Sequence, residues 1–178
     1  MIITHDVVQG TPEWFAMREG LWTGSTAIRL LQGKILQSMG DWLGNIWTKR
    51  GQLLEMVAVR EYEREVGHKI TRPGFVTNTL YPNAGYSPDG IDGDILIENK
   101  SLNGVRHEDL VAGKIPLEYL CQVYFGMVIT GTKHARLLAF NPEYPDQLVI
   151  IEIKYNSKIG GNIRRKLKED QQKRSLPR

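Results

Sequence analysis

AGYSPDGIDGDILIENKS, residues 84–101, is the most informative run of the chain. Its Asp-Gly and Gly-Asp pairs favour a tight turn, and the apolar Ile-Leu-Ile that follows them favours a strand. We therefore expect a short strand, a turn and a second strand. Because side chains on a strand alternate between its two faces, Glu98 and Lys100 should share one face and Asn99 should take the other.

This hairpin is expected to gather acidic side chains. If its two strands pair, Asp89 at the end of the first lies beside Glu98 on the second, with Lys100 close to both. Two carboxylates repel each other unless a cation lies between them. Mg²⁺ suits that place because it binds carboxylate oxygens, backbone carbonyls and water. The pattern therefore predicts a divalent-metal site, and a charged, solvated hairpin is the alternative.

Pro88-Asp89, an eight-residue gap and Glu98-Asn99-Lys100 together resemble the PD-(D/E)XK signature of metal-dependent nucleases. The resemblance implies an α/β fold with a restriction-endonuclease-like core, in which a central mixed β-sheet is flanked by α-helices. It implies that Asp89, Glu98 and the main-chain carbonyl of Asn99 hold the metal. Lys100 would orient the attacking water and stabilise developing negative charge. The expected cofactor is one or two Mg²⁺ ions, with Mn²⁺ as a substitute.

A second run, GTPEWFAMREGLWTGS at residues 10–25, resembles the N-terminal signature of the YqaJ-like viral recombinase family, the relatives of bacteriophage lambda exonuclease. This resemblance implies that Arg18 and Ser25 hold the 5′-phosphate of DNA. Ser87 matches a further family serine with the same role. The residues alone predict only two helices with aromatic packing, the first capped by Thr11 and the second by Ser25.

Two later helices are expected to add residues to the site. A helix over about 48–66 carries Glu55 among apolar neighbours, and a buried acid needs a partner, such as an Arg or a Lys. Its Gly-x-x-x-Glu-x-x-Ala-x-x-x-Tyr spacing resembles a family motif whose Glu lies at the metal site. A helix over about 115–129 carries Gln122, which matches a family Tyr-x-x-Gln pattern next to the metal-bound water. Tyr124 stands where the family often has a second Gln.

Length, composition and charge predict the domain organisation and the nature of the C-terminal end. The 178 residues, of which 41% are hydrophobic and 24% charged, predict one globular domain over 1–170 and a flexible basic tail over 171–178. Residues 154–178 hold nine Lys and Arg against two acidic residues, and residues 1–153 hold 14 against 18. The basic end suits a polyanionic partner, and a solvated terminal helix is the alternative.

Several classes are excluded or disfavoured. Cys121 is the single cysteine, which excludes an intramolecular disulfide, a Cys-type zinc site and a cysteine-bound iron–sulfur cluster. No apolar run approaches the roughly 18–20 residues of a membrane span, and the N-terminus lacks a signal-peptide pattern. We therefore expect no membrane partner and a cytoplasmic location, in a bacterial or phage-infected cell. Trp42 and Trp47 are expected in the core more than on DNA bases, and His107 on the surface.

The family resemblance implies a Mg²⁺-dependent exonuclease that digests linear double-stranded DNA 5′→3′ from a 5′-phosphorylated end. It would leave a 3′ single strand for phage-type recombination, with a single-strand annealing protein or recombinase as partner. Family members can form a trimeric ring around DNA, so a homo-oligomer is considered. One alternative is a structure- or site-specific endonuclease on the same core. The other is a catalytically dead DNA-binding accessory protein, which the intact Asp89, Glu98 and Lys100 argue against.

Overall fold

The computed structural model describes residues 1–36 and 46–175, without the side chains of 46–50 and 52. Trp42 and the side chain of Trp47 therefore lie outside the described part of the chain. The elements follow in the order β1 (Ile2–His5), α1 (Pro12–Arg18), the 3₁₀-helix η1 (Gly24–Thr26), α2 (Ala27–Leu31), α3 (Ile46–Val66), β2 (Phe75–Asn78), β3 (Gly85–Tyr86), β4 (Gly90–Asp92), β5 (Ile95–Ser101), α4 (Gly104–Val111), α5 (Leu117–Thr130), β6 (His134–Phe140), β7 (Leu148–Lys154) and α6 (Ser157–Arg174).

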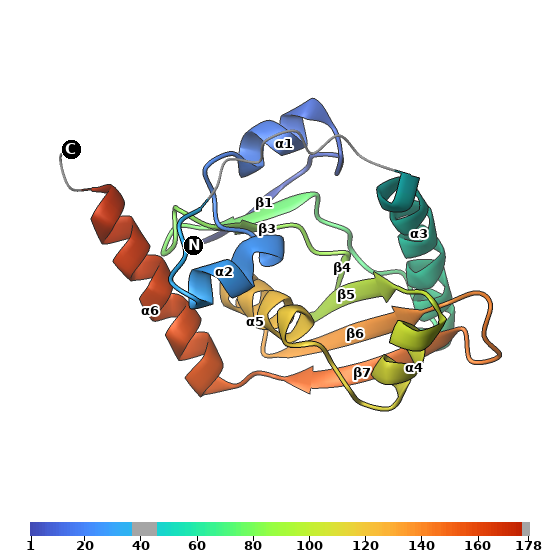
Figure 1. Ribbon diagram of the computed structural model, residues 1–178. Helices are drawn as coiled ribbons and strands as arrows, with labels where there is room; N and C mark the ends of the chain where they lie inside the picture. The colour runs from blue at the N-terminus through green and yellow to red at the C-terminus, as the bar shows by residue number, and fades with distance from the viewer. Residues whose placement is uncertain (37–45, 176–178) are drawn as a thin grey trace.

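The strands form two sheets (Figure 1). One has the order β4-β5-β6-β7, with β5 and β6 parallel and the outer pairs antiparallel, which is the mixed sheet that the sequence predicts. The other is antiparallel, with the order β1-β2-β3. The predicted hairpin is divided between them, because β3 pairs with β2 and only β4 pairs with β5. Pro88, which lies at this break, has no N–H with which to continue a ladder.

Helices cover both faces of the mixed sheet, as the sequence predicts. α3 packs on one face, where Tyr62 joins Ile97 and Leu138 in an apolar cluster. The neighbouring residues Leu96 and Leu137 point to the opposite face and belong to the larger core around α5. α4 and α5 form the crossover that parallel β5 and β6 require. Strand β5 thus lies between α3 and α5.

α5 lies at the centre of the molecule (Figure 1), in contact with both sheets and with η1, α2 and α6. Its C-terminal half is buried on more than one side, from Val123 to Thr130. The helix ends at Gly131, whose left-handed φ of 75° gives a standard helix stop. Because it is enclosed by other elements, α5 is a rigid support for the side chains that it directs toward β5.

Some local expectations differ from the structure. Ser25 does not cap a helix, because Thr23 precedes η1 and its N–H donates to Thr26 Oγ1 at 2.9 Å. Helix α6 continues to Arg174, past the position where a basic tail was expected to begin, and residues 176–178 lie outside the described part. Within the described residues, no helix is long and apolar enough to cross a membrane.

Candidate active site

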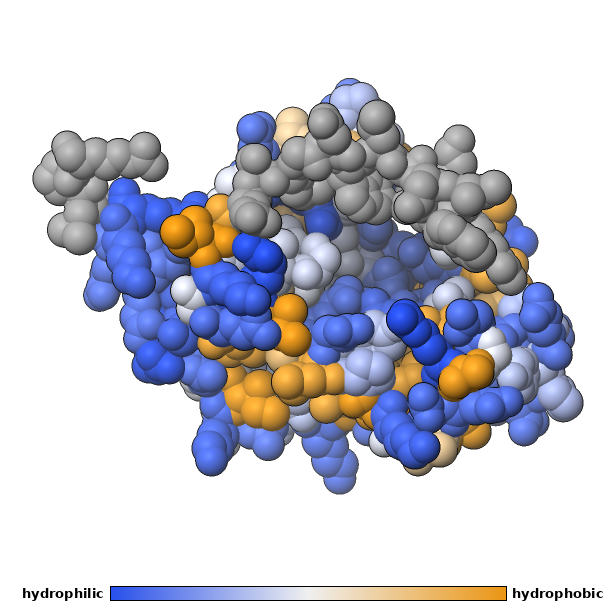
Figure 2. Space-filling model, viewed as in Figure 1, coloured by the Kyte–Doolittle hydropathy of each residue, from blue (hydrophilic) through white to orange (hydrophobic). Residues whose placement is uncertain are grey.

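A pocket of about 220 Å³ opens where α1, η1, α3 and α5 meet the ends of β3 and β5. Figure 2 shows this face of the molecule hollowed, with hydrophilic residues inside the hollow. The pocket is lined by Gln9, Trp14, Arg18, Gly24, Ser25, Glu55, Tyr86, Ser87, Asp89, Glu98, Asn99, Lys100 and Gln122. Every residue that the sequence nominated for the site is therefore in one place, although these residues come from distant parts of the chain.

The β4–β5 pairing sets the acidic centre. Gly90 pairs with Ile97, so the next position along the ladder places Asp89 beside Glu98, as expected from the hairpin. The Asp89 carboxylate accepts a hydrogen bond from the Asn99 N–H at 2.6 Å. Asn99 points its side chain away from Glu98 and donates to Ser101 Oγ at 2.9 Å. Local strand geometry alone is enough to bring these groups together.

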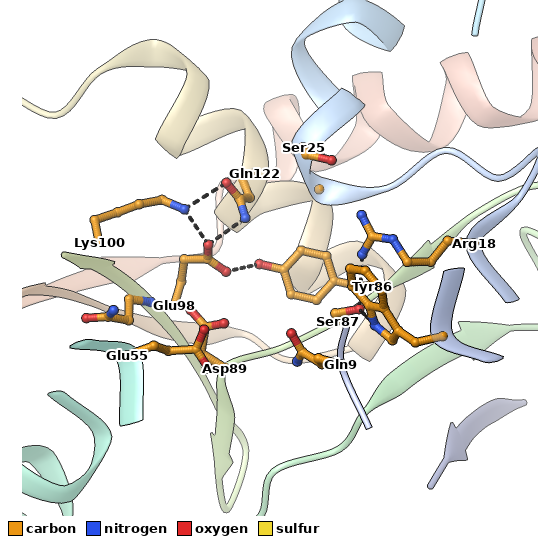
Figure 3. Close-up of a pocket in the computed structure, with 13 residues that line it drawn as sticks. Gln9, Arg18, Ser25, Glu55, Tyr86, Ser87, Asp89, Glu98, Lys100 and Gln122 are labelled. Atoms are coloured by element: carbon orange, nitrogen blue, oxygen red, sulfur yellow. Dashed lines mark hydrogen bonds and ion pairs between the residues drawn. The ribbon is translucent and has the colours of Figure 1, made fainter. Parts of the chain in front are cut away.

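The Glu98 carboxylate is held from two sides (Figure 3). Its Oε1 accepts from Lys100 Nζ at 2.7 Å and from Gln122 Nε2 at 2.5 Å. Its Oε2 accepts from the Tyr86 hydroxyl. Lys100 also donates to Gln122 Oε1 at 3.0 Å, which closes a ring of three contacts. Gln122 thus links α5 to Glu98 and Lys100 of β5.

Glu55 enters the pocket from α3 and has an arginine partner. Its carboxylate accepts from Arg72 at 2.6 Å, and Arg72 also donates to the main-chain oxygen of Asp89 at 3.1 Å. Glu55 is thus paired with an Arg, as one interpretation expected, and it also faces Asp89 in the pocket (Figure 3). Arg72 was not anticipated as a link between α3 and the acidic centre.

The protonation of the centre reflects burial and mutual repulsion. Burial raises the pKa of Asp89 well above its usual range, and the charges of Glu98 and Glu55 raise it further. Burial also raises the pKa of Glu55, against the opposing effect of Arg72. Burial disfavours the Lys100 ammonium, but Glu98 and Asp89 outweigh it, so the pKa of Lys100 is raised. Lys100 is therefore charged at neutral pH.

These side chains fit a hard cation in their chemistry. Crowded carboxylates with a raised pKa are relieved when a divalent ion lies between them. Carboxylate and carbonyl oxygens are the ligands that Mg²⁺ prefers. In the described part of the chain, however, no three His, Cys, Asp or Glu side chains converge closely enough to hold a metal by themselves. Asp89 and Glu98 are thus the side-chain donors, and main-chain oxygen and water would have to complete the set.

A second cluster lies at the other end of the pocket. Arg18 donates to Ser87 Oγ at 3.1 Å, and its guanidinium stacks over the Trp14 ring at 4.0 Å. Trp14 Nε1 donates to the same Ser87 oxygen at 2.9 Å. Ser25 lies across the pocket on η1, within 3.1 Å of the Thr23 hydroxyl (Figure 3). The structure therefore joins Arg18 directly to Ser87 and leaves Ser25 facing them.

Arg18 is a half-buried cation, and its Nε is fully enclosed. Burial lowers its pKa to about 10, which still leaves it charged at neutral pH. Among the residues that the structure describes, no carboxylate forms an ion pair with it, and its Nε has no hydrogen-bond partner. A charge that is partly removed from water is costly unless it is paired. An anionic ligand is the natural partner for this end of the pocket.

Sequence reasoning missed some of the lining residues. Gln9 donates to the Pro88 main-chain oxygen at 3.3 Å and lies between the two clusters. Tyr86 was passed over although it directly precedes Ser87 in the hairpin run. His107 was expected on the surface and is instead 1% exposed, against the Tyr144 ring at 4.9 Å. It sits on the inner side of α4, where amphipathic periodicity could have indicated burial.

Comparisons with known proteins show the family of the chain and its structural relatives. Residues 13–133 match the YqaJ-like viral recombinase domain, so the chain belongs to this family. Among solved structures it resembles LHK-Exo in complex with dAMP, at 27% identity and a TM-score of 0.77, with 92% of each chain covered. It also resembles the alkaline exonuclease LHK-Exo from Laribacter hongkongensis, at 26% identity and a TM-score of 0.76, with 92% of each chain covered.

A phage-related exonuclease from Haemophilus somnus 129PT shares the fold, at 11% identity and a TM-score of 0.63, with 89% of this chain and 95% of that chain covered. No curated protein matches the chain. The family and the two alkaline exonuclease structures together support a nuclease that acts on DNA as the class of this protein.

Proposed function

We propose that this protein is a Mg²⁺-dependent exonuclease that hydrolyses the phosphodiester bonds of linear double-stranded DNA from a 5′-phosphorylated end. The observation that carries the proposal is the pocket itself. It holds a buried acidic centre with a charged lysine at one end and, at the other, a half-buried arginine that has no carboxylate partner among the described residues. Membership of the YqaJ-like family and the likeness to alkaline exonucleases support the same activity.

In this proposal Asp89, Glu98 and the main-chain carbonyl of Asn99 hold Mg²⁺, with Glu55 as a further ligand or close neighbour. Mn²⁺ would substitute, and the site would take one or two ions. The bound metal would lower the pKa of water and neutralise charge on the phosphate. Lys100, held in place by Glu98 and Gln122, would stabilise the negative charge that develops during cleavage.

The Arg18 cluster would bind the terminal 5′-phosphate. A phosphate accepts charge-assisted hydrogen bonds from a guanidinium and from hydroxyls, and Arg18, Ser87 and Ser25 offer these groups around one space. The stacked Trp14 ring fixes the guanidinium plane. Holding the terminal phosphate at one end of the pocket would place a nearby phosphodiester at the acidic centre, which favours cleavage from an end.

Direction and biological setting follow from the family in this proposal. Digestion would run 5′→3′ and leave a 3′ single strand, which a single-strand annealing protein or recombinase would use. A trimeric ring around DNA is the oligomer that the family suggests. The basic surface of α6, with Lys158, Lys168 and Lys173 exposed, would favour contact with the DNA backbone.

The test compares three DNAs in the presence of Mg²⁺: a linear 5′-phosphorylated duplex, a linear 5′-hydroxyl duplex and a covalently closed circle. Wild type should release mononucleotides from the linear DNAs alone, and faster with the 5′-phosphate. Lys100→Ala should be inactive on all three. Lys69→Ala is the matched control, because Lys69 is exposed and pairs with Glu63 outside the pocket, and it should behave as wild type.

Other outcomes of this test would favour one of the alternative functions. Cutting of the closed circle would favour a structure- or site-specific endonuclease on the same core. If wild type cuts none of the three with Mg²⁺ or Mn²⁺, the enzyme proposal fails for duplex DNA and a DNA-binding accessory protein remains. Activity that persists in Lys100→Ala would remove the lysine from the mechanism.

A further inference from the structure

Tyr86 is a buried tyrosine whose hydroxyl reaches the acidic centre. Its side chain is 1% exposed, on the short strand β3. The hydroxyl donates to Oε2 of Glu98, whereas Lys100 and Gln122 both donate to Oε1. Each oxygen of this carboxylate is thus held from a different direction, one from β3 and the other from β5 and α5 (Figure 3).

Two glycines fix the position of the Tyr86 ring. A Cβ atom on Gly24 of η1 would lie 2.6 Å from ring atom Cε2, and a Cβ on Gly126 of α5 would lie 2.6 Å from Cζ. Contacts this short mean that the ring lies directly against both backbones. The hydroxyl is therefore a fixed point, set by three separate elements, and it has little freedom to follow Glu98 if that side chain turns.

The hydroxyl is not needed to fill the core. A phenylalanine would occupy the same space between the two glycines, and it would bury no polar group. A buried hydroxyl costs free energy unless it finds a hydrogen-bond partner, and Glu98 is the partner it has. The hydrogen bond to Glu98 explains why a hydroxyl is present here. A group that hydrogen-bonds to a metal ligand sets the orientation of that ligand and strengthens metal binding.

We propose that Tyr86 is a positioning residue, which fixes the orientation in which the Glu98 carboxylate meets the divalent cation; this inference rests on the proposed function. Tyr86 also lies next to Ser87, which bonds Arg18. The same short segment thus positions both ends of the pocket: the acidic centre through Tyr86 and the arginine through Ser87.

The test is a calorimetric titration of MgCl₂ and MnCl₂ into metal-free wild type, Tyr86→Phe and Tyr81→Phe. Tyr86→Phe removes a single oxygen atom and should weaken metal binding about tenfold, in the range found for groups that support metal ligands. Its nuclease activity should need correspondingly more metal and recover at saturation. Tyr81 is also a buried core tyrosine, but it lies outside the pocket, so Tyr81→Phe should bind metal as wild type does.

A double-mutant cycle separates positioning from packing. In a Glu98→Gln background, Tyr86→Phe should cause no further loss of metal affinity, because the hydroxyl acts through the carboxylate. The melting temperature of each metal-free variant checks folding. If Tyr86→Phe is less stable, the cycle still separates the two effects, because a loss of packing would lower metal affinity in both backgrounds. If wild type and Tyr86→Phe bind metal with equal affinity, and differ at most in melting temperature, the positioning role of Tyr86 is overturned while the proposed function stands. If wild type binds neither ion, the metal-dependent function fails and this inference fails with it.

Discussion

At the scale of single residues, Arg18 shows most directly what the pocket can bind. Its guanidinium is half-buried, stacked on Trp14 and hydrogen-bonded to Ser87, without a carboxylate partner in the described chain. A neutral ligand would leave that charge uncompensated, whereas a phosphate would pair with it. Lysine cannot replace this arrangement, because it lacks the planar guanidinium that stacks and donates in two directions.

We therefore expect Arg18→Lys to remove the preference for 5′-phosphorylated ends. Its kcat/KM on a 5′-phosphorylated duplex should fall about 10- to 100-fold, the size expected for a lost hydrogen bond to a charged group. Its kcat/KM on a 5′-hydroxyl duplex should change little. Arg64→Lys, at an exposed ion pair on α3, is the control. If the ratio of kcat/KM on the 5′-phosphorylated duplex to kcat/KM on the 5′-hydroxyl duplex is the same as in wild type, Arg18 does not contact the terminal phosphate.

At the scale of elements, the close approach of α5 to β3 and β5 determines how Gln122 and Tyr86 meet. A Cβ on Gly126 would lie 2.6 Å from the Tyr86 ring and 2.7 Å from Leu96 Cδ2, whereas a Cβ on Gly51 of α3 would meet nothing within 4 Å. Gly126→Ala should lower the free energy of unfolding by about 1–3 kcal/mol through overpacking. Gly51→Ala should leave it unchanged or raise it by up to about 1 kcal/mol. Urea unfolding measures both.

Equal stabilities of Gly126→Ala and Gly51→Ala would contradict the close packing of α5. The same pair of variants also tests the site, since Gly126→Ala should displace the Tyr86 ring. Its metal affinity should fall together with its stability, whereas Gly51→Ala should keep both.

The junction of α3 with β4 provides a pH-dependent prediction. Asp92 accepts from His68 at 2.7 Å and from Tyr62 at 2.7 Å, and its pKa is lowered, first by the bond from His68 and then by that from Tyr62. A carboxyl group whose pKa falls on folding stabilises the protein above its unfolded pKa of about 3.9. That stabilisation is lost as the pH falls through the lower folded pKa.

Asp92→Asn should therefore unfold more easily than wild type at pH 6, by about 1–3 kcal/mol, and the difference should vanish toward about pH 2. Thermal or urea unfolding across this range measures it. Asp146→Asn, in the exposed β6–β7 loop, should show no such trend. A difference that stays constant with pH would mean that the Asp92 charge does not support the junction.

At the scale of the whole molecule, charge is unevenly distributed. The C-terminal residues 154–178 are strongly basic, and most of them form α6, which packs along one side of the molecule against α2 and α5 (Figure 1). Replacing the exposed Lys158, Lys168 and Lys173 by Gln should weaken binding to duplex DNA. The slope of log K against log salt should become shallower by up to about three, close to one for each lost phosphate contact.

Fluorescence anisotropy at several salt concentrations measures this slope. Lys69→Gln, outside α6, should leave the slope unchanged. An unchanged slope in the triple variant would assign α6 to a solvated helix, the alternative that the sequence left open, and would place the DNA path elsewhere on the surface.

The parts that could be predicted from the sequence are those in which short-range geometry decides. Strand alternation puts Glu98 and Lys100 on one face, and the tight turn places Asp89 opposite Glu98. Thr11 marks the start of a helix because the preference of its side chain and backbone acts locally. These features need no knowledge of distant residues, and all are present in the structure.

Other features depend on contacts between distant segments. The sequence could not show that Arg72 pairs with Glu55, that His107 is buried against Tyr144, or that the 84–101 run is shared between two sheets. Tyr86 is the clearest case, since its role depends on Gly24 and Gly126, 62 residues before it and 40 after it. Local secondary-structure propensity carries no information about these long-range contacts, which form when the helices pack on the sheets.

The sequence by itself therefore determined the chemical groups of the site, the local geometry of the acidic hairpin and the α/β class. Only the tertiary structure decided that the Arg18 cluster and the acidic centre share one pocket, and which side chains hold Glu98 in place. The physical reason is the distance along the sequence over which each interaction acts. Backbone geometry acts over a few residues, whereas close packing and burial, which shift the pKa of Asp89 and confine Tyr86, arise only when the whole core is assembled.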